Sequence, residues 1–188
     1  MNFVENEAMD QLQLLQDLEK RTRFALERAK YYASLSEERL TTRPTEGQWN
    51  VLECVAHLNQ YCGFYHPQLD KQLRNASGGN GTFTSGWLGN YMVKAVSPGA
   101  DKKKMKTFKK TAPIGQDLDV SVIEVFIQHQ NDFLDLLALA HDHNLQPKKI
   151  KTMMPLVKLR LGDALRVQAY HNHRHIEQAD QVLANLGT

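Results

Sequence analysis

Three histidines within five residues are the part of this sequence best suited to chemistry: His171, His173 and His175, in the run HNHRH. On a helix with 3.6 residues per turn, His171 and His175 lie about one turn apart on the same face. Their imidazoles can therefore bind one metal ion, as paired histidines on a helix do in metalloproteases. His173 lies about 200° around the axis from His171, so we expect it to point elsewhere, into solvent.

Two helical histidines need a further ligand, because catalytic sites for zinc and similar ions usually have three protein ligands and an open position for water. His57 is the best candidate, since an unpaired imidazole in its apolar surroundings would be costly to bury. His66 lies roughly 180° around the same predicted helix and cannot share a site with His57. His129 could be a fourth participant. The structural alternatives are a core His57 bonded to a carbonyl group and a solvated helix face over residues 171–175.

Four long amphipathic helices must position these histidines. Apolar residues recur at three- and four-residue steps in four segments, which predicts helices over about 6–34, 50–74, 119–143 and 161–186. No segment alternates with a period of two, so we predict no sheet. Four such helices predict an all-α protein, a four-helix bundle that forms a single domain over residues 1–188.

Local signals refine the helix ends and the connections. Asn50 and Glu53 have the spacing of a capping box, and Pro67 predicts a kink or an early end near His66. The long connection over 75–117 is rich in glycine and then in lysine, with a short helix predicted over 87–96. Trp87 in that helix could cap the core or serve as a lid near the metal end.

The composition excludes several classes of protein. The 188 residues carry 23 basic and 21 acidic side chains, a net charge of +2, so no overall attraction to nucleic acid or membranes is expected. No run reaches the length of a transmembrane helix, and the first residues lack the pattern of a signal peptide. Cys54 and Cys62 lie too far apart on one predicted helix to form a disulfide. A reducing, cytoplasmic location fits best.

Two segments resemble motifs of the DinB/YfiT-like proteins: WNVLECVAHLNQ from Trp49 to Gln60, and LGDALRVQAYHNHRHIEQ from Leu161 to Gln178. In that family a Trp opens the second helix and a His follows about two turns later. The last helix carries a His, three residues and another His, followed by a Gln. The resemblance covers essentially the whole chain. It implies a four-helix bundle with up-down-down-up connectivity, in which residues 75–117 form the long crossover.

The resemblance also implies a divalent metal, zinc or nickel, held by three histidines at one end of the bundle. By position these are His57, His171 and His175, with His173 as an extra imidazole between the last two. Characterised relatives include thiol-dependent S-transferases and a mycothiol-dependent isomerase, in which the metal activates a low-molecular-weight thiol. A metal-dependent transferase or hydrolase acting on a small molecule, able to pair as a homodimer, is therefore expected. The alternative is a non-catalytic, metal-stabilised binding or stress-response module.

Three side chains beside these histidines have two interpretations each. Glu53 could orient an imidazole, although a role as a cap residue is simpler. Gln60 and Gln178 follow His57 and His175 by three residues, and could reach the open coordination position or remain ordinary polar residues at its rim.

Overall fold

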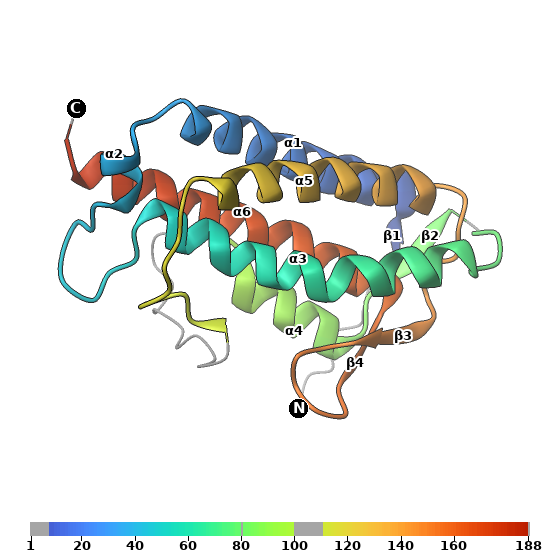
Figure 1. Ribbon diagram of the computed structural model, residues 1–188. Coiled ribbons are helices and arrows are strands. Elements are labelled where there is room, and N and C mark those ends of the chain that lie inside the picture. The colour runs from blue at the N-terminus through green and yellow to red at the C-terminus, as the bar shows by residue number, and fades with distance from the viewer. Residues whose placement is uncertain (1–7, 80, 100–110, 188) are drawn as a thin grey trace.

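The computed structural model describes residues 8–79, 81–99 and 111–187, and within them the protein is mostly helical (Figure 1). Four long helices pack against one another. They are α1 (Gln11–Ala33), α3 (Val51–Arg74), α5 (Ser121–Ala140) and α6 (Leu161–Asn185). The shorter elements are β1 (Ala8–Asp10), α2 (Glu37–Thr41), β2 (Thr82–Thr84), α4 (Trp87–Val96), β3 (Lys148–Lys151) and β4 (Lys158–Arg160).

The start of α3, which positions His57, is fixed by the predicted capping box. The Asn50 side chain accepts a hydrogen bond from the Glu53 amide at 2.8 Å, and the Glu53 carboxylate accepts one from the Asn50 amide at 2.9 Å. The helix does not end near His66 but continues to Arg74. Pro67 has no N–H to donate to the carbonyl of Gly63, four residues earlier. Both residues lie on the exposed face of the helix, where water can bind that carbonyl.

The prediction that the chain has no sheet is wrong in detail. β1 pairs with β2 and β3 pairs with β4, both antiparallel, in strands of only three or four residues. Segments this short cannot show a sustained two-residue period. The first pair also moves the start of α1 from residue 6 to Gln11, because Asp10 ends β1 and its side chain accepts from the Gln13 amide at 2.8 Å.

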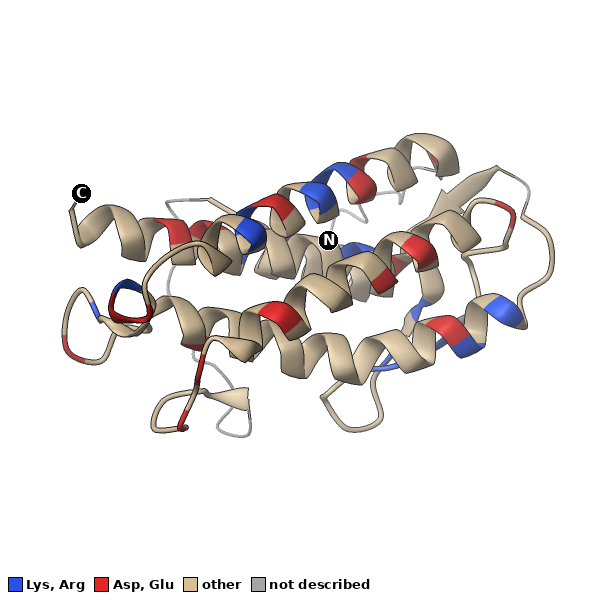
Figure 2. Ribbon diagram, turned by 45° about the horizontal axis from the view of Figure 1, so that its top comes forward, with Lys and Arg blue, Asp and Glu red and all other residues tan. Residues whose placement is uncertain are grey.

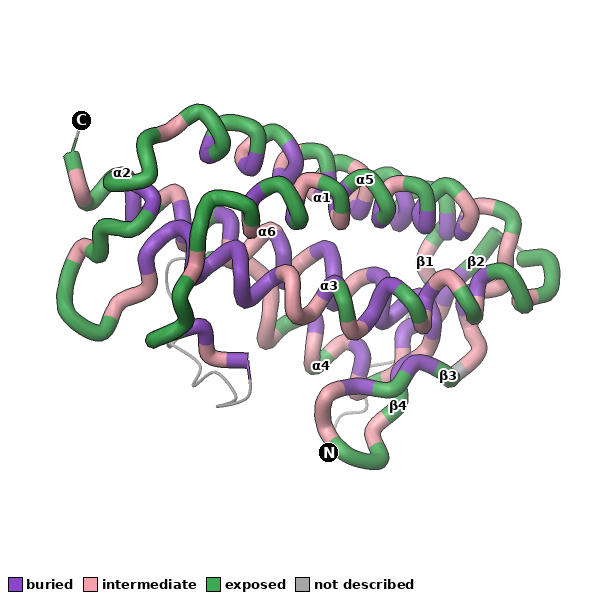
Figure 3. Tube along the Cα trace, viewed as in Figure 1, coloured by how far each residue is buried: buried purple, intermediate pink, exposed green. Residues whose placement is uncertain are grey.

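The core lies along the inner faces of the long helices (Figure 3). A buried polar group interrupts it where α3, α5 and α6 meet. Asn172 donates to Gln130 at 3.1 Å and accepts from Gln168 at 3.0 Å, and Gln168 also contacts the Cys62 sulfur at 3.2 Å. Because these bonds join α6 to both α3 and α5, they help to fix the rotation of α6 about its own axis. They therefore help to direct the neighbouring His171 toward α3.

The predicted short helix is present as α4 and packs on α6. Gly89 and Val93 are its buried residues. Gly89 allows the close approach, because a Cβ atom there would lie 2.0 Å from Cγ of Asp163. Trp87 is 76% exposed and Tyr91 66%, so Trp87 does not cap the core. The lysine-rich stretch, residues 102–110, lies outside the described residues.

Acidic and basic residues are interspersed along the helices (Figure 2), in keeping with the small net charge. Among the described residues, no helix combines the length and the apolar character needed to span a membrane.

Candidate metal centre

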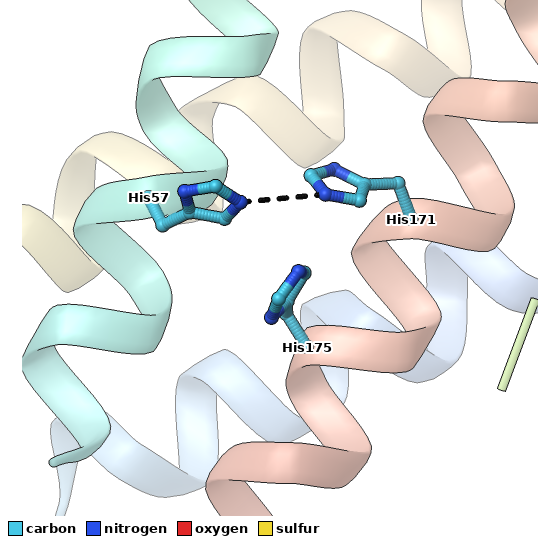
Figure 4. Close-up of side chains that lie close together, drawn as sticks. All are labelled: His57, His171 and His175. Carbon is cyan, nitrogen blue, oxygen red and sulfur yellow. Dashed lines mark hydrogen bonds between the residues drawn. The ribbon is translucent and has the colours of Figure 1, made fainter. Parts of the chain in front are cut away.

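The three predicted ligands meet where α3 faces α6 (Figure 4). Nε2 of His57 lies 3.4 Å from Nε2 of His171, and the ring of His175 has its centroid 4.7 Å from that of His57 and 4.6 Å from that of His171. One ring nitrogen from each residue lies within 4.8 Å of the other two. His57 and His171 are buried, while His175 is partly exposed. The cluster is therefore closed on the core side and accessible at His175.

The Nδ1 hydrogen bonds of two rings leave their Nε2 atoms unprotonated, which is the form that can bind a metal. Nδ1 of His57 lies 2.8 Å from the Thr111 carbonyl, which can only accept, so Nδ1 carries the proton. Nδ1 of His175 likewise donates to Oε1 of Gln178 at 2.8 Å. Nδ1 of His171 is buried and has no hydrogen-bond partner among the described residues.

The spacing of the cluster fits a tetrahedral ion. Two nitrogen ligands of one zinc ion lie about 3.3 Å apart, given bonds of about 2.0 Å, and the Nε2 atoms of His57 and His171 are 3.4 Å apart. The alternative interpretation of His57, as a core residue bonded to a carbonyl group, also holds, because Nδ1 of His57 donates to the Thr111 carbonyl. That bond leaves Nε2 directed at the other two rings. The residues present therefore fit a three-histidine metal site.

Burial keeps all three imidazoles neutral, which is the form that binds metals. It lowers the pKa of His57. Burial, and then the repulsion that a protonated His171 would meet from protonated His175 and His57, hold the pKa of His171 well below its ordinary value. Burial, and then His57, lower the pKa of His175 to about 3. Three neutral ligands would leave an ion its full charge.

The metal-free protein should lose stability as the pH falls below about 6.5. His175 has a pKa of about 3 when folded but an ordinary pKa when unfolded, so the unfolded chain binds more protons between these values. Its contribution is complete above the unfolded pKa and is lost as the pH falls toward 3. Urea unfolding of metal-stripped protein, from about pH 7.5 to about pH 4.5, should show a steeper decline in unfolding free energy than the His175→Gln variant shows. Equal slopes would contradict this assignment.

Two aromatic residues form walls of the cluster. Trp49 stacks on His175 with ring centroids 5.7 Å apart. The ring centroid of Tyr61 lies 4.3 Å from that of His171 and 4.8 Å from that of His57. Sequence reasoning placed Trp49 at the helix entrance and did not single out Tyr61, and so missed both as site residues. The signal for Tyr61 was its position four residues after His57, which puts the two on one helix face.

The structure also shows the contacts of Glu53, Gln178 and His173. Glu53 is a cap residue, as expected, and its carboxylate also binds Arg43 at 2.5 Å. Gln178 orients His175 instead of reaching an open coordination position. His173 points away from the cluster, as predicted, but not freely into solvent. Its ring stacks on Phe24 with centroids 4.7 Å apart.

The interpretation of residues 171–175 as a solvated helix face is wrong, since His171 is 7% exposed and Asn172 only 1%. His129 does not join this cluster; it lies beside His66 on another side of α3.

Gln178→Ala should weaken metal binding about 10- to 100-fold, the usual cost of losing a hydrogen-bond partner of a ligating histidine. The His175 ring would lose the acceptor that fixes its orientation and keeps the proton on Nδ1. The matched control is Gln181→Ala on the same helix, whose amide donates to the Asn185 side chain at the exposed surface. Competition with a chromophoric chelator measures both affinities, and equal losses in the two variants would refute the orienting role.

A comparison with known protein families gives a match over most of the chain. The family model of the DinB superfamily matches residues 19–179, a range that contains all three clustered histidines. No curated protein and no solved structure matches the chain.

Proposed function

This chain belongs to the DinB superfamily, and from that membership we propose that it is a metal-dependent enzyme whose catalytic divalent ion, zinc or nickel, is held by His57, His171 and His175. The observation that carries the proposal is the convergence of three neutral imidazoles from two helices. Two of their Nε2 atoms already have the separation expected of two ligands of one ion.

We also propose that the long helices form a four-helix bundle in up-down-down-up order. In Figure 1, α3 and α5 both begin at the end of the assembly where α1 and α6 finish, which supports this order. The connection from α3 to α5 is then the long crossover.

Each group around the cluster has a role in the proposed chemistry. A divalent ion here would lower the pKa of a bound water or thiol and so supply hydroxide or thiolate at neutral pH. Thr111 and Gln178 hold protons on Nδ1 of His57 and His175. Trp49 and Tyr61 cover the rings with aromatic surface. Burial raises the pKa of Tyr61, so its hydroxyl stays protonated and can donate a hydrogen bond.

The nucleophilic thiol must come from a second substrate. Cys54 and Cys62 are free and buried, and burial raises the pKa of both, that of Cys62 to about 12, so neither supplies a thiolate. We therefore propose transfer of a low-molecular-weight thiol to a small electrophile. The sulfur–carbon bond forms, the leaving group departs with its electron pair, and the thiol proton passes to solvent. Hydrolysis is the same displacement with water. Two free cysteines also suit the reducing cytoplasm.

A screen of metal-loaded protein tests this function, with low-molecular-weight thiols paired against alkyl halides, epoxides and activated esters. We expect turnover in the wild-type protein and in His173→Ala, and none in His175→Ala. Equal turnover in His175→Ala would refute a metal-dependent reaction. Stoichiometric metal without turnover of any pair would favour the metal-stabilised binding module.

A further inference from the structure

His66 on α3 is buried without any of the hydrogen bonds that an imidazole requires. It is 7% exposed, and neither Nδ1 nor Nε2 has a partner among the described residues. A neutral imidazole carries one donor and one acceptor, and leaving both unpaired in the interior is energetically unfavourable. Buried polar groups in proteins are nearly always bonded, so this ring calls for a ligand.

Two further potential ligands lie beside His66. They are His129 and Asp132, three residues apart on one face of α5. One ring nitrogen of His66, one ring nitrogen of His129 and one carboxylate oxygen of Asp132 all lie within 4.8 Å of one another. The rings of His66 and His129 meet edge to face, with centroids 5.3 Å apart. His66 is buried, His129 is partly exposed and Asp132 is exposed, so the group opens from the core to solvent.

This group is separate from the cluster on α6. His57 and His66 are nine residues apart on a continuous helix, which places them about 13 Å apart along the axis and roughly on opposite sides of it. His57 faces α6, whereas His66 faces α5. The face of His66 is set by packing, since its ring stacks on Phe133 with an interplanar angle of 7° and centroids 5.3 Å apart.

We propose that His66, His129 and Asp132 form a second metal site that binds a divalent transition ion between α3 and α5. Two imidazoles and one carboxylate suit borderline ions such as zinc, cobalt or nickel, in preference to magnesium or calcium, which prefer oxygen. Burial, and then the neighbouring His129, lower the pKa of His66 to about 4, so its ring is neutral at pH 7. The ion would give His66 a partner and tie the two helices together.

The test is a cobalt titration of metal-stripped protein, followed by equilibrium dialysis and by the visible absorption of bound cobalt. His66→Ala would also remove a core ring, so the variants are His129→Ala and Asp132→Asn at the surface. One matched control is Asp135→Asn on α5, an exposed carboxylate one turn away. The other is His141→Ala just past the end of α5, whose ring pairs with Glu19 at 3.2 Å.

We expect two cobalt equivalents in the wild-type protein and both controls, one in His129→Ala, and at least tenfold weaker binding of the second equivalent in Asp132→Asn. His171→Ala should lose the other equivalent, and His129→Ala combined with His171→Ala should lose both. Unchanged stoichiometry and affinity in His129→Ala would overturn the second site, as would a wild-type protein whose only equivalent disappears in His171→Ala. If only the three-histidine site is absent, the wild-type protein should bind a single equivalent. His129→Ala should then remove that equivalent, and His171→Ala should leave it in place.

Discussion

His171→Ala should lower metal affinity at the α3–α6 cluster by at least about 100-fold, beyond the usual cost of losing a hydrogen-bond partner of a ligand. His171 is buried between His57 and His175, and its Nε2 lies 3.4 Å from that of His57. Two remaining imidazoles cannot complete the three-ligand set of a typical zinc enzyme site. His57→Ala and His175→Ala should have the same effect.

His173→Ala is the matched control for this loss. It removes the same side chain from the same helix two residues away, but its ring stacks on Phe24 outside the cluster. Affinities should be measured by chelator competition in the His129→Ala background, so that only one site contributes. If His173→Ala removes the metal while His171→Ala retains it, the ligand assignment is wrong.

In the His129→Ala background, where only the three-histidine site remains, zinc should raise the melting temperature of metal-stripped protein by about 5–10 °C. An ion that binds only the folded state at 100 times its dissociation constant stabilises by about 2.7 kcal/mol. For a chain of this length each kcal/mol corresponds to about 2–4 °C. The burial of His57 and His171 supports a site that exists only in the folded chain.

The same thermal scan distinguishes this site from non-specific zinc binding. In the His129→Ala background, the rise should persist with His173→Ala and disappear with His171→Ala. A melting temperature that is identical with and without zinc, in protein verified to start metal-free, would contradict a folded-state site.

Much of the fold and of the cluster could be predicted because it depends on local periodicity. The 3.6-residue pattern locates the four long helices, and the one-turn spacing of His171 and His175 fixes their shared face. His57 stood out because a polar ring in an apolar run needs a partner. The capping box at Asn50 was equally readable, since a cap depends on residues only three apart.

The remainder depends on contacts between distant segments. Thr111 lies 54 residues from His57, so no spacing rule could assign its carbonyl to that ring. His66 meets His129 only because α3 and α5 pack in one register, although both histidines were visible in the sequence. The exposure of Trp87 follows from Gly89 bringing the other side of α4 against Asp163, a contact that hydrophobicity alone does not predict.

The most direct measurement of the three-histidine centre is anomalous diffraction from crystals grown with zinc, recorded on both sides of the zinc absorption edge. We expect an anomalous peak between α3 and α6, about 2.0–2.1 Å from one nitrogen each of His57, His171 and His175. A zinc-loaded crystal with no peak between these three rings would contradict the assignment.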